Sequence, residues 1–261
     1  MRYGIRDIVD VEVVDVATKK PLIYFESLKT STTEVVTANV AARGGRGNPK
    51  RIVWESDKDV TFNCEDCVVS PQGLALLFGN SLVTGATAVP IAEIVASTSA
   101  DTLVLAATPV VTATNIMTVY TTTDRSTPET EYTLGSISNP NEYTLTGNTV
   151  SLPAATVTGT LFLVSYYKTS SALNKKITIA SDKFAGTYKI TGSSLMRAED
   201  ATGDYPCRIV IPKAKLLSSI TINQAATGDP TVFPWKFLVL KDMLSSTLIE
   251  YNVETDTPIV Q

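Results

Sequence analysis

Apolar and polar residues alternate along most of the chain, and valine, isoleucine, threonine and tyrosine are frequent in the alternating segments. A period of two with these residue types is typical of β-strands that bury one face. The pattern predicts strands at residues 8–16, 22–29, 33–40, 51–63, 175–180, 187–197, 207–217, 219–225 and 233–241. We therefore expect an all-β, mainly antiparallel fold, built as a β-barrel or β-sandwich.

One segment departs from this period. Ser70 is followed by a proline, then by an apolar run at residues 74–78, and Gly79 ends the run. Serine is favoured at a helix N-cap, proline at the first helical position and glycine just past the end. We expect one short helix that covers an opening of the barrel or sandwich with its larger side chains, Leu74, Leu77 and Phe78.

Residues 86–170 differ from the rest of the chain in composition and charge. They are rich in threonine, alanine and valine, and 6 acidic against 2 basic residues give them a net charge of −4. Subtraction from the totals of 26 acidic and 22 basic residues leaves 20 of each elsewhere. We expect an inserted immunoglobulin-like β-sandwich at 86–170 within a barrel domain formed by 1–85 and 171–261, or else one continuous β-domain. The insert should contain strands at 102–107, 115–121, 131–134, 143–145, 149–152 and 160–167.

The composition restricts the class of protein. Charged residues make up 18% of the chain, below the roughly 25% of average globular proteins. This indicates either a surface that partners cover or a large buried core. No apolar stretch approaches the ~18 residues of a membrane-spanning helix, and the first residues lack a signal-peptide pattern. We expect no membrane insertion, and a net charge of −4 argues against tight binding of nucleic-acid phosphates.

The residues give no indication of catalysis. The chain contains no histidine, the usual general base of hydrolases and a common metal ligand. Two pairs of carboxylates, Asp57 with Asp59 and Glu199 with Asp200, lie in polar segments where acids are usually solvated. We expect a protein that is not an enzyme and that needs no cofactor.

Three cysteines are present, which is an odd number for a disulfide framework. Cys64 and Cys67 form a single CxxC motif, and Cys207 is the only further thiol. A structural zinc site needs four ligands, and histidine is missing as a substitute. We expect these thiols to pack in the interior and to bind no metal.

Several segments follow one another in an order of loop, strand and helix that carries further information. Residues 43–50 form a glycine-rich loop that leads into a strand at 51–55, and a strand at 62–69 leads into the helix. Near the C-terminus, residues 219–230 precede Phe233 and an apolar strand. In this order the segments resemble the tail tube proteins of tailed bacteriophages, which are similar in fold to the ring protein of type VI secretion. The inserted region resembles the immunoglobulin-like modules of phage virion proteins, in its segments 142–145, 149–152 and 164–167.

The resemblance implies a structural component of the virion tail, assembled in the host cytoplasm. Copies would form rings, generally hexameric, which stack into a tube through which DNA passes without specific binding. Ring closure removes exposed strand edges, and head-to-tail stacking that never closes gives a filament. Sheath and tape-measure proteins are the other partners that the resemblance implies. A head, neck or decoration protein, or a carbohydrate-binding or adhesive β-sandwich with Tyr166 and Tyr167 as its aromatic site, are the alternatives.

One loop is the candidate for a contact between rings or subunits. It combines three glycines, which give conformational freedom, with basic side chains. An ordinary solvated hairpin tip is the alternative, and an RGG-like RNA-binding segment would need interleaved aromatic residues. Trp54 and Trp235 should pack in the core or between subunits, and residues 1–6 and 255–261 should be arms ordered only in the assembly. The loop consists of Arg43, Gly44, Gly45, Arg46, Gly47, Asn48, Pro49 and Lys50.

Overall fold

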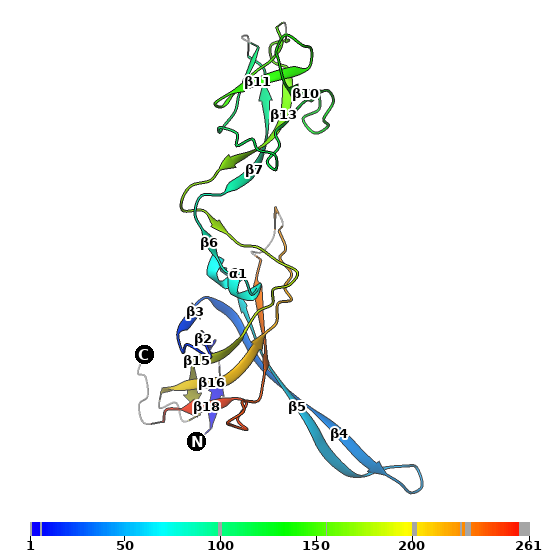
Figure 1. The fold of residues 1–261 in the computed structure, drawn as a ribbon. Coiled ribbons are helices and arrows are strands. Elements are labelled where there is room, and N and C mark those ends of the chain that lie inside the picture. The colour runs from blue at the N-terminus through cyan, green and yellow to red at the C-terminus, as the bar shows by residue number, and fades with distance from the viewer. Residues whose placement is uncertain are drawn as a thin grey trace. The chain divides into compact units, whose positions relative to one another are not determined.

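A computed structural model describes residues 2–5, 7–98, 101–154, 156–199, 203–224, 226–227 and 231–255. The chain divides into two compact units (Figure 1). Unit 1 consists of Met1–Leu82 and Ile177–Gln261, and unit 2 is Val83–Lys176. Both units are built from β-strands, and the described residues contain a single α-helix, so the predicted all-β fold is confirmed.

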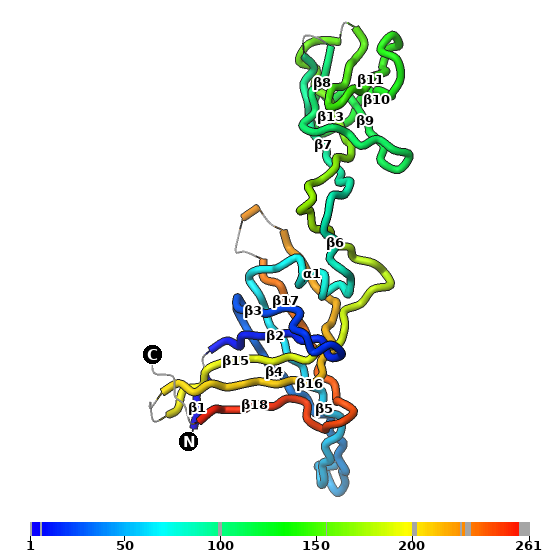
Figure 2. The backbone as a smooth tube through the Cα atoms, turned by 60° about the vertical axis from the view of Figure 1, so that its left-hand side comes forward, coloured from blue at the N-terminus to red at the C-terminus, as the bar shows by residue number. Residues whose placement is uncertain are grey.

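Unit 1 contains one nine-stranded sheet in which all pairs are antiparallel. Its strands are β1 (Tyr3–Ile5), β2 (Asp10–Asp15), β3 (Pro21–Phe25), β4 (Leu28–Arg43), β5 (Lys50–Asp66), β15 (Thr187–Ala198), β16 (Asp204–Leu216), β17 (Phe233–Val239) and β18 (Glu250–Val253). The order is β3-β2-β15-β16-β17-β5-β4, while β1 also pairs with β15 and β18 with β16. Figure 2 shows β15, β16 and β18 side by side.

This sheet curls into a nearly closed barrel. The strands at the two ends of its order, β3 and β4, are consecutive in the sequence and are separated only by Glu26 and Ser27. The hydroxyl of Ser27 donates a hydrogen bond of 2.6 Å to the buried carboxylate of Asp66, which fixes this corner against β5. Inside, the ring of Trp235 lies 4.8 Å from that of Phe25, centroid to centroid. The apolar faces of the strands therefore share one core.

The helix α1 (Pro71–Leu77) begins and ends where the sequence predicts. The side chain of Ser70 accepts a hydrogen bond of 3.0 Å from the Gly73 backbone amide, which caps the first turn. Gly79 follows the helix with φ +64°, a left-handed conformation that favours glycine. Leu77 and Phe78 are buried in the barrel core, so α1 covers one end of the barrel.

Unit 2 contains a seven-stranded sheet with its own core. The order is β7-β13-β9-β10-β11-β12-β8, in which only β10 and β11 are parallel, and a short ladder joins β6 to β14. Phe162, Val119 and Val150 are fully buried at its centre. The strands are β6 (Val83–Thr84), β7 (Ala88–Ala96), β8 (Thr102–Val104), β9 (Thr118–Thr121), β10 (Glu131–Leu134), β11 (Glu142–Thr146), β12 (Thr149–Ser151), β13 (Leu161–Thr169) and β14 (Lys175–Lys176).

Some predicted elements of unit 1 are wrong. Residues 219–224 form no strand, and of 175–180 only Lys175 and Lys176 are paired. Alternation of apolar and polar residues identifies a segment that can pair, but a strand also needs a free neighbouring edge. Among the N-terminal residues, Tyr3–Ile5 pair with β15 within the single chain, so the prediction that this arm is ordered only in an assembly is wrong there. Of the other predicted arm, residues 256–261 lie outside the described residues.

Candidate assembly surface

The hairpin of β4 and β5 has two halves with different surroundings. Near the barrel, β5 pairs with β17 on one side, from Thr61 to Asp66, and with β4 on the other. Beyond this point, in the part of the chain that the structure describes, β4 and β5 pair only with each other. We call residues 34–59 the ribbon; it extends from the barrel as two strands joined by a loop (Figure 1). Both of its edges are open.

The predicted contact loop, Arg43–Lys50, lies at the end of the ribbon as a defined turn. The Gly44 amide donates to the Pro49 carbonyl at 3.3 Å, and the Asn48 amide donates to the Gly45 carbonyl at 3.0 Å. Gly45 and Gly47 have φ of +90° and +84°. These two glycines are thus explained by left-handed backbone in a tight turn.

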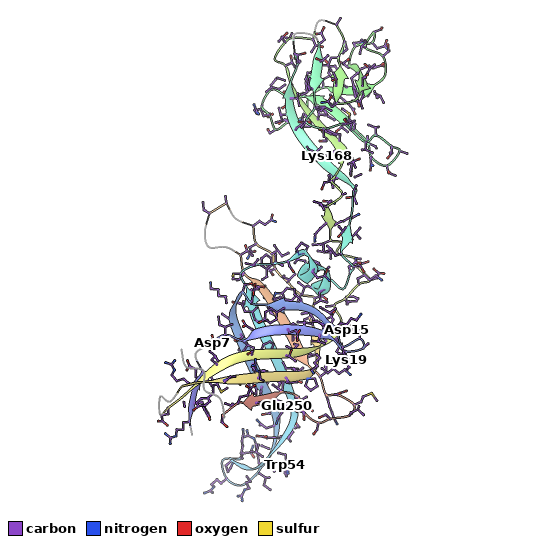
Figure 3. All side chains as sticks on the ribbon, turned by 90° about the vertical axis from the view of Figure 1, so that its left-hand side faces the viewer. Asp7, Asp15, Lys19, Trp54, Lys168 and Glu250 are labelled. Atoms are coloured by element: carbon purple, nitrogen blue, oxygen red, sulfur yellow. The ribbon has the colours of Figure 1, made fainter. Side chains whose placement is uncertain are left out.

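Large apolar side chains are exposed along the ribbon. Val40 pairs with Trp54 and Ala42 pairs with Ile52, so these four side chains lie on one face. In the barrel half of the same strand, Phe62 is only 1% exposed. Figure 3 shows the Trp54 side chain on the ribbon, away from the barrel core. Six such side chains are between 51% and 62% exposed: Val35, Val36, Val40, Ile52, Val53 and Trp54.

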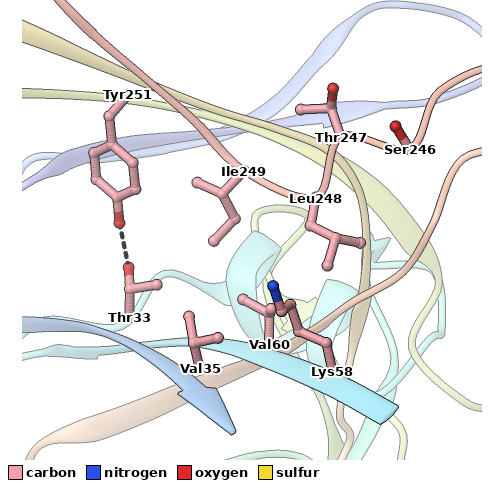
Figure 4. A pocket seen from close by; sticks show the side chains of 9 residues that line it. All are labelled: Thr33, Val35, Lys58, Val60, Ser246, Thr247, Leu248, Ile249 and Tyr251. Carbon is pink, nitrogen blue, oxygen red and sulfur yellow. Dashed lines mark hydrogen bonds between the residues drawn. The ribbon is translucent and has the colours of Figure 1, made fainter. Parts of the chain in front are cut away.

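The base of the ribbon is anchored by the segment before β18. The hydroxyl groups of Thr33 and Tyr251 form a hydrogen bond of 2.7 Å between β4 and β18 (Figure 4). Leu248 and Ile249 pack against the barrel core. Together with Val35, Lys58 and neighbouring residues, they line a cavity of about 380 Å³. These contacts hold the base, and the described residues leave the apolar side chains farther along the ribbon exposed.

Charge is unevenly distributed along the ribbon. We call residues 43–51 the tip and residues 34–42 and 52–59 the shaft. The tip carries four basic residues, Arg43, Arg46, Lys50 and Arg51, and no acidic one. The shaft carries four acidic residues, Glu34, Glu55, Asp57 and Asp59, and one basic residue, Lys58. The net charges are therefore +4 and −3.

Two pairs of acidic residues remain from the candidates that the sequence offers. No cluster of three or more histidine, cysteine or acidic side chains that could hold a metal ion lies among the described residues. Asp57 and Asp59 are exposed on β5, within the strand predicted at 51–63. Glu199 lies 3.8 Å from the guanidinium of Arg2, and Asp200 lies outside the described residues.

The thiols differ in their surroundings. Cys64 and Cys207 are buried, as expected, whereas Cys67 is exposed, so the prediction of an interior thiol is wrong for Cys67. Cys67 follows the end of β5, and its thiol donates to the Ser27 carbonyl at 3.2 Å. Burial, with a smaller effect from Asp66, raises the pKa of the Cys64 thiol to about 12. That thiol therefore stays protonated and unreactive.

Tyr166 and Tyr167 do not form an exposed aromatic platform. Tyr166 is 2% exposed within the core of unit 2. Its hydroxyl donates to a Glu93 carboxylate oxygen at 2.7 Å and accepts from the Ala107 amide at 3.1 Å. Burial, followed by the Glu93 carboxylate, raises the pKa of Tyr166. The hydroxyl is satisfied internally, so the residue stabilises unit 2.

The sequence analysis did not predict the exposed apolar side chains of the ribbon, although the sequence contains a pattern that indicates them. Val35 and Val36 are adjacent, and residues 52–54 are three consecutive apolar residues. In a strand, neighbouring residues point to opposite faces, so such runs place apolar groups on both faces. A two-stranded ribbon with apolar groups on both faces is a sign of a surface that a partner covers.

Comparison with known proteins gives one family. The model described as the YomU/Tube protein family matches residues 3–251, which includes both units. Among curated proteins, none matches the sequence. No helix among the described residues has the length and apolar character needed to span a membrane.

Proposed function

Because this chain belongs to the YomU/Tube protein family, and is thus a structural protein of the phage tail tube, we propose that its copies associate through the ribbon into stacked rings. The observation that carries the proposal is the exposure of six large apolar side chains on a two-stranded ribbon. An isolated two-stranded hairpin is at best marginally stable in water. A surface of this kind gains stability when another copy covers it.

Burial of the exposed apolar side chains would supply the free energy of association. Fully burying a large apolar side chain contributes about 1.5–3 kcal/mol, and these side chains are already about half buried. Each would add on the order of 1 kcal/mol, less the entropy lost when side chains become ordered. One hairpin gives a weak contact, but a ring with a hairpin from every copy multiplies it. Assembly through the ribbon should therefore be cooperative.

The other parts of the proposal extend the resemblance to phage tail tube proteins. The rings would be hexameric, and DNA would pass through their lumen without specific binding. Unit 2 would be an immunoglobulin-like module on the outside of the tube, because a lumen has little room for it. Sheath and tape-measure proteins would be further partners. Assembly in the host cytoplasm before release of the virion completes this account.

Electron microscopy of the purified protein over a concentration series tests the proposal. We expect hollow filaments with a regular axial repeat above a critical concentration. In a shortened variant, Val35 and Val60 would be joined by an Asn-Gly turn in place of residues 36–59. These two residues already face each other across the hairpin, and Asn-Gly suits a two-residue connection. The variant should fold and stay monomeric; filaments formed by it would contradict a role of the ribbon in assembly.

A further inference from the structure

The charges of the ribbon form no ion pair among the described residues. Ion pairs in the described residues join Arg2 to Glu199, Arg197 to Asp204 and Arg208 to Glu254, all outside the ribbon. In the tip, the Arg51 guanidinium donates to the Gly44 carbonyl at 2.9 Å and so stabilises the turn. The described structure gives the four shaft carboxylates no hydrogen bond. Both sets of charges are therefore available to a partner.

The positions of these charges restrict how two ribbons can lie together. Two ribbons that point the same way in register would place tip beside tip and shaft beside shaft, so like charges would meet. A shift along the ribbon axis by about half its length brings the +4 tip of one copy beside the −3 shaft of the other. The same shift lays ribbon against ribbon, so it covers apolar residues such as Trp54 and Val40.

We propose that the basic tip of the ribbon of one copy docks against the acidic shaft of a second copy. This inference rests on the proposed function and names the contact that the assembly uses. A second copy is favoured as the partner because each chain presents both complementary surfaces. The contact is heterologous: the surface that donates the tip differs from the one that receives it. Each copy keeps a free tip or shaft for the next, so the contact can repeat from copy to copy, and it closes into a ring where the rotation between copies allows it.

Salt should weaken the contact. Exposed charges are screened over about 10 Å at 0.1 M ionic strength and over shorter distances at higher salt. The critical concentration for filaments should therefore rise as NaCl increases from about 0.05 to 0.5 M. Apolar association alone would show the opposite trend or none. A critical concentration that falls with NaCl would contradict the proposal.

Charge reversal provides the decisive test. The tip variant R43E/R46E lowers the net charge of the tip from +4 to 0, and the shaft variant E55K/D59K changes that of the shaft from −3 to +1, so each removes the net attraction in the proposed contact. Both leave Arg51 in place, since it holds the turn. We expect each variant to raise the critical concentration about tenfold, because exposed pairs contribute up to about 1 kcal/mol and reversal makes them repulsive. The measurement is sedimentation of filaments against total protein, with circular dichroism to confirm folding.

A chain that combines the tip and shaft substitutions shows whether the partner of the tip is the shaft of another copy or a different anionic molecule. In a chain that carries all four reversals, the changed positions of tip and shaft again have opposite signs, so its critical concentration should fall well below that of either variant alone. K175E/K176E, on exposed β14 in unit 2, makes the same change in net charge as the tip variant and should have little effect. Failure of the combined chain to recover, or an effect of the tip variant without one of the shaft variant, would overturn the proposal. The latter result would indicate a different anionic partner of the tip, such as nucleic acid.

The outcomes also separate this inference from the proposed function. Filaments that resist all charge reversals but disappear in the shortened variant would leave the ribbon as the assembly surface and contradict only the tip-to-shaft contact. A wild-type chain that stays monomeric at every concentration and salt would contradict both.

Discussion

The two halves of the β4–β5 hairpin differ in what covers them, although they are continuous in sequence. In the barrel half, Phe62 and Cys64 are buried in the core beside β17, and each is 1% exposed. In the ribbon half, residues of the same apolar kind are more than half exposed. The same type of apolar strand is thus buried by other strands in the barrel half and exposed in the ribbon half. This difference is the basis of the proposal that another copy covers the ribbon.

The two tryptophans give the strongest test of this comparison. Trp235 is 1% exposed in the barrel, and Trp54 is 53% exposed on the ribbon. Trp235→Ala leaves a cavity in the core and should lower the free energy of unfolding of unit 1 by about 3–5 kcal/mol. Trp54→Ala should lower it by less than about 1 kcal/mol, because the residue is a surface position in the single chain. Urea unfolding, at a protein concentration below the threshold for assembly, measures the free energy of unfolding of both variants.

For assembly we expect the opposite order: a substitution at Trp54 should have the larger effect and one at Trp235 the smaller. Trp54→Ala removes an aromatic group from the proposed contact and should raise the critical concentration for filaments about tenfold or more. Trp235→Phe, which keeps most of the core volume, is the matched control and should assemble as the wild type does. If Trp54→Ala unfolds the chain as Trp235→Ala does, or assembles normally, the distinction between the two halves fails.

Two glycines with left-handed backbone extend the comparison. Gly79 and Gly47 have φ of +64° and +84°, so alanine at either position costs about 1–2 kcal/mol in backbone strain. At Gly79 a Cβ would also overlap the Phe184 carbonyl, whereas at Gly47 no atom lies within 4 Å. Gly79→Ala should therefore destabilise unit 1 by at least about 1 kcal/mol more than Gly47→Ala. Thermal unfolding of the two variants measures the difference; equal losses would contradict the tight packing after α1.

The reactivity of thiols on β5 reports how well individual positions of its two halves are covered, and it is the smallest of the expected effects. In a Cys67→Ser background, the buried Cys64, with a pKa of about 12, should react with a thiol reagent only when the chain unfolds. A cysteine introduced as Val53→Cys, where the native residue is 51% exposed, should react at once. In filaments the V53C thiol should become protected. Fast labelling of Cys64 in the folded monomer would show that the barrel half is less closed than described.

The sequence predicted the local features of this fold well. The helix was predictable because Ser70 and Gly79 act on the backbone next to them, through a cap and a left-handed turn. Long strands such as β15 were predictable because alternation persists over many residues. The strand predicted at 219–225 was wrong because pairing depends on an edge contributed by a distant segment. Nothing in local alternation reports whether that edge is free.

The assembly surface was predictable only in part. The glycines and basic residues of 43–50 marked the tip, since turns have local signatures. The exposure of Trp54 was not predictable, because it depends on where β17 stops pairing with β5 at Thr61. A tryptophan in an apolar strand reads the same whether its neighbour belongs to its own chain or to another. The contact role of the tip remains a proposal.

Reconstruction of the filaments by electron cryomicroscopy would show directly whether another copy covers the ribbon. The account predicts that the ribbon of each copy lies against another copy, with Trp54 covered and the basic tip beside acidic shaft residues such as Glu55 and Asp59. A tube in which every ribbon projects into solvent, with Trp54 as exposed as in the single chain, would contradict it.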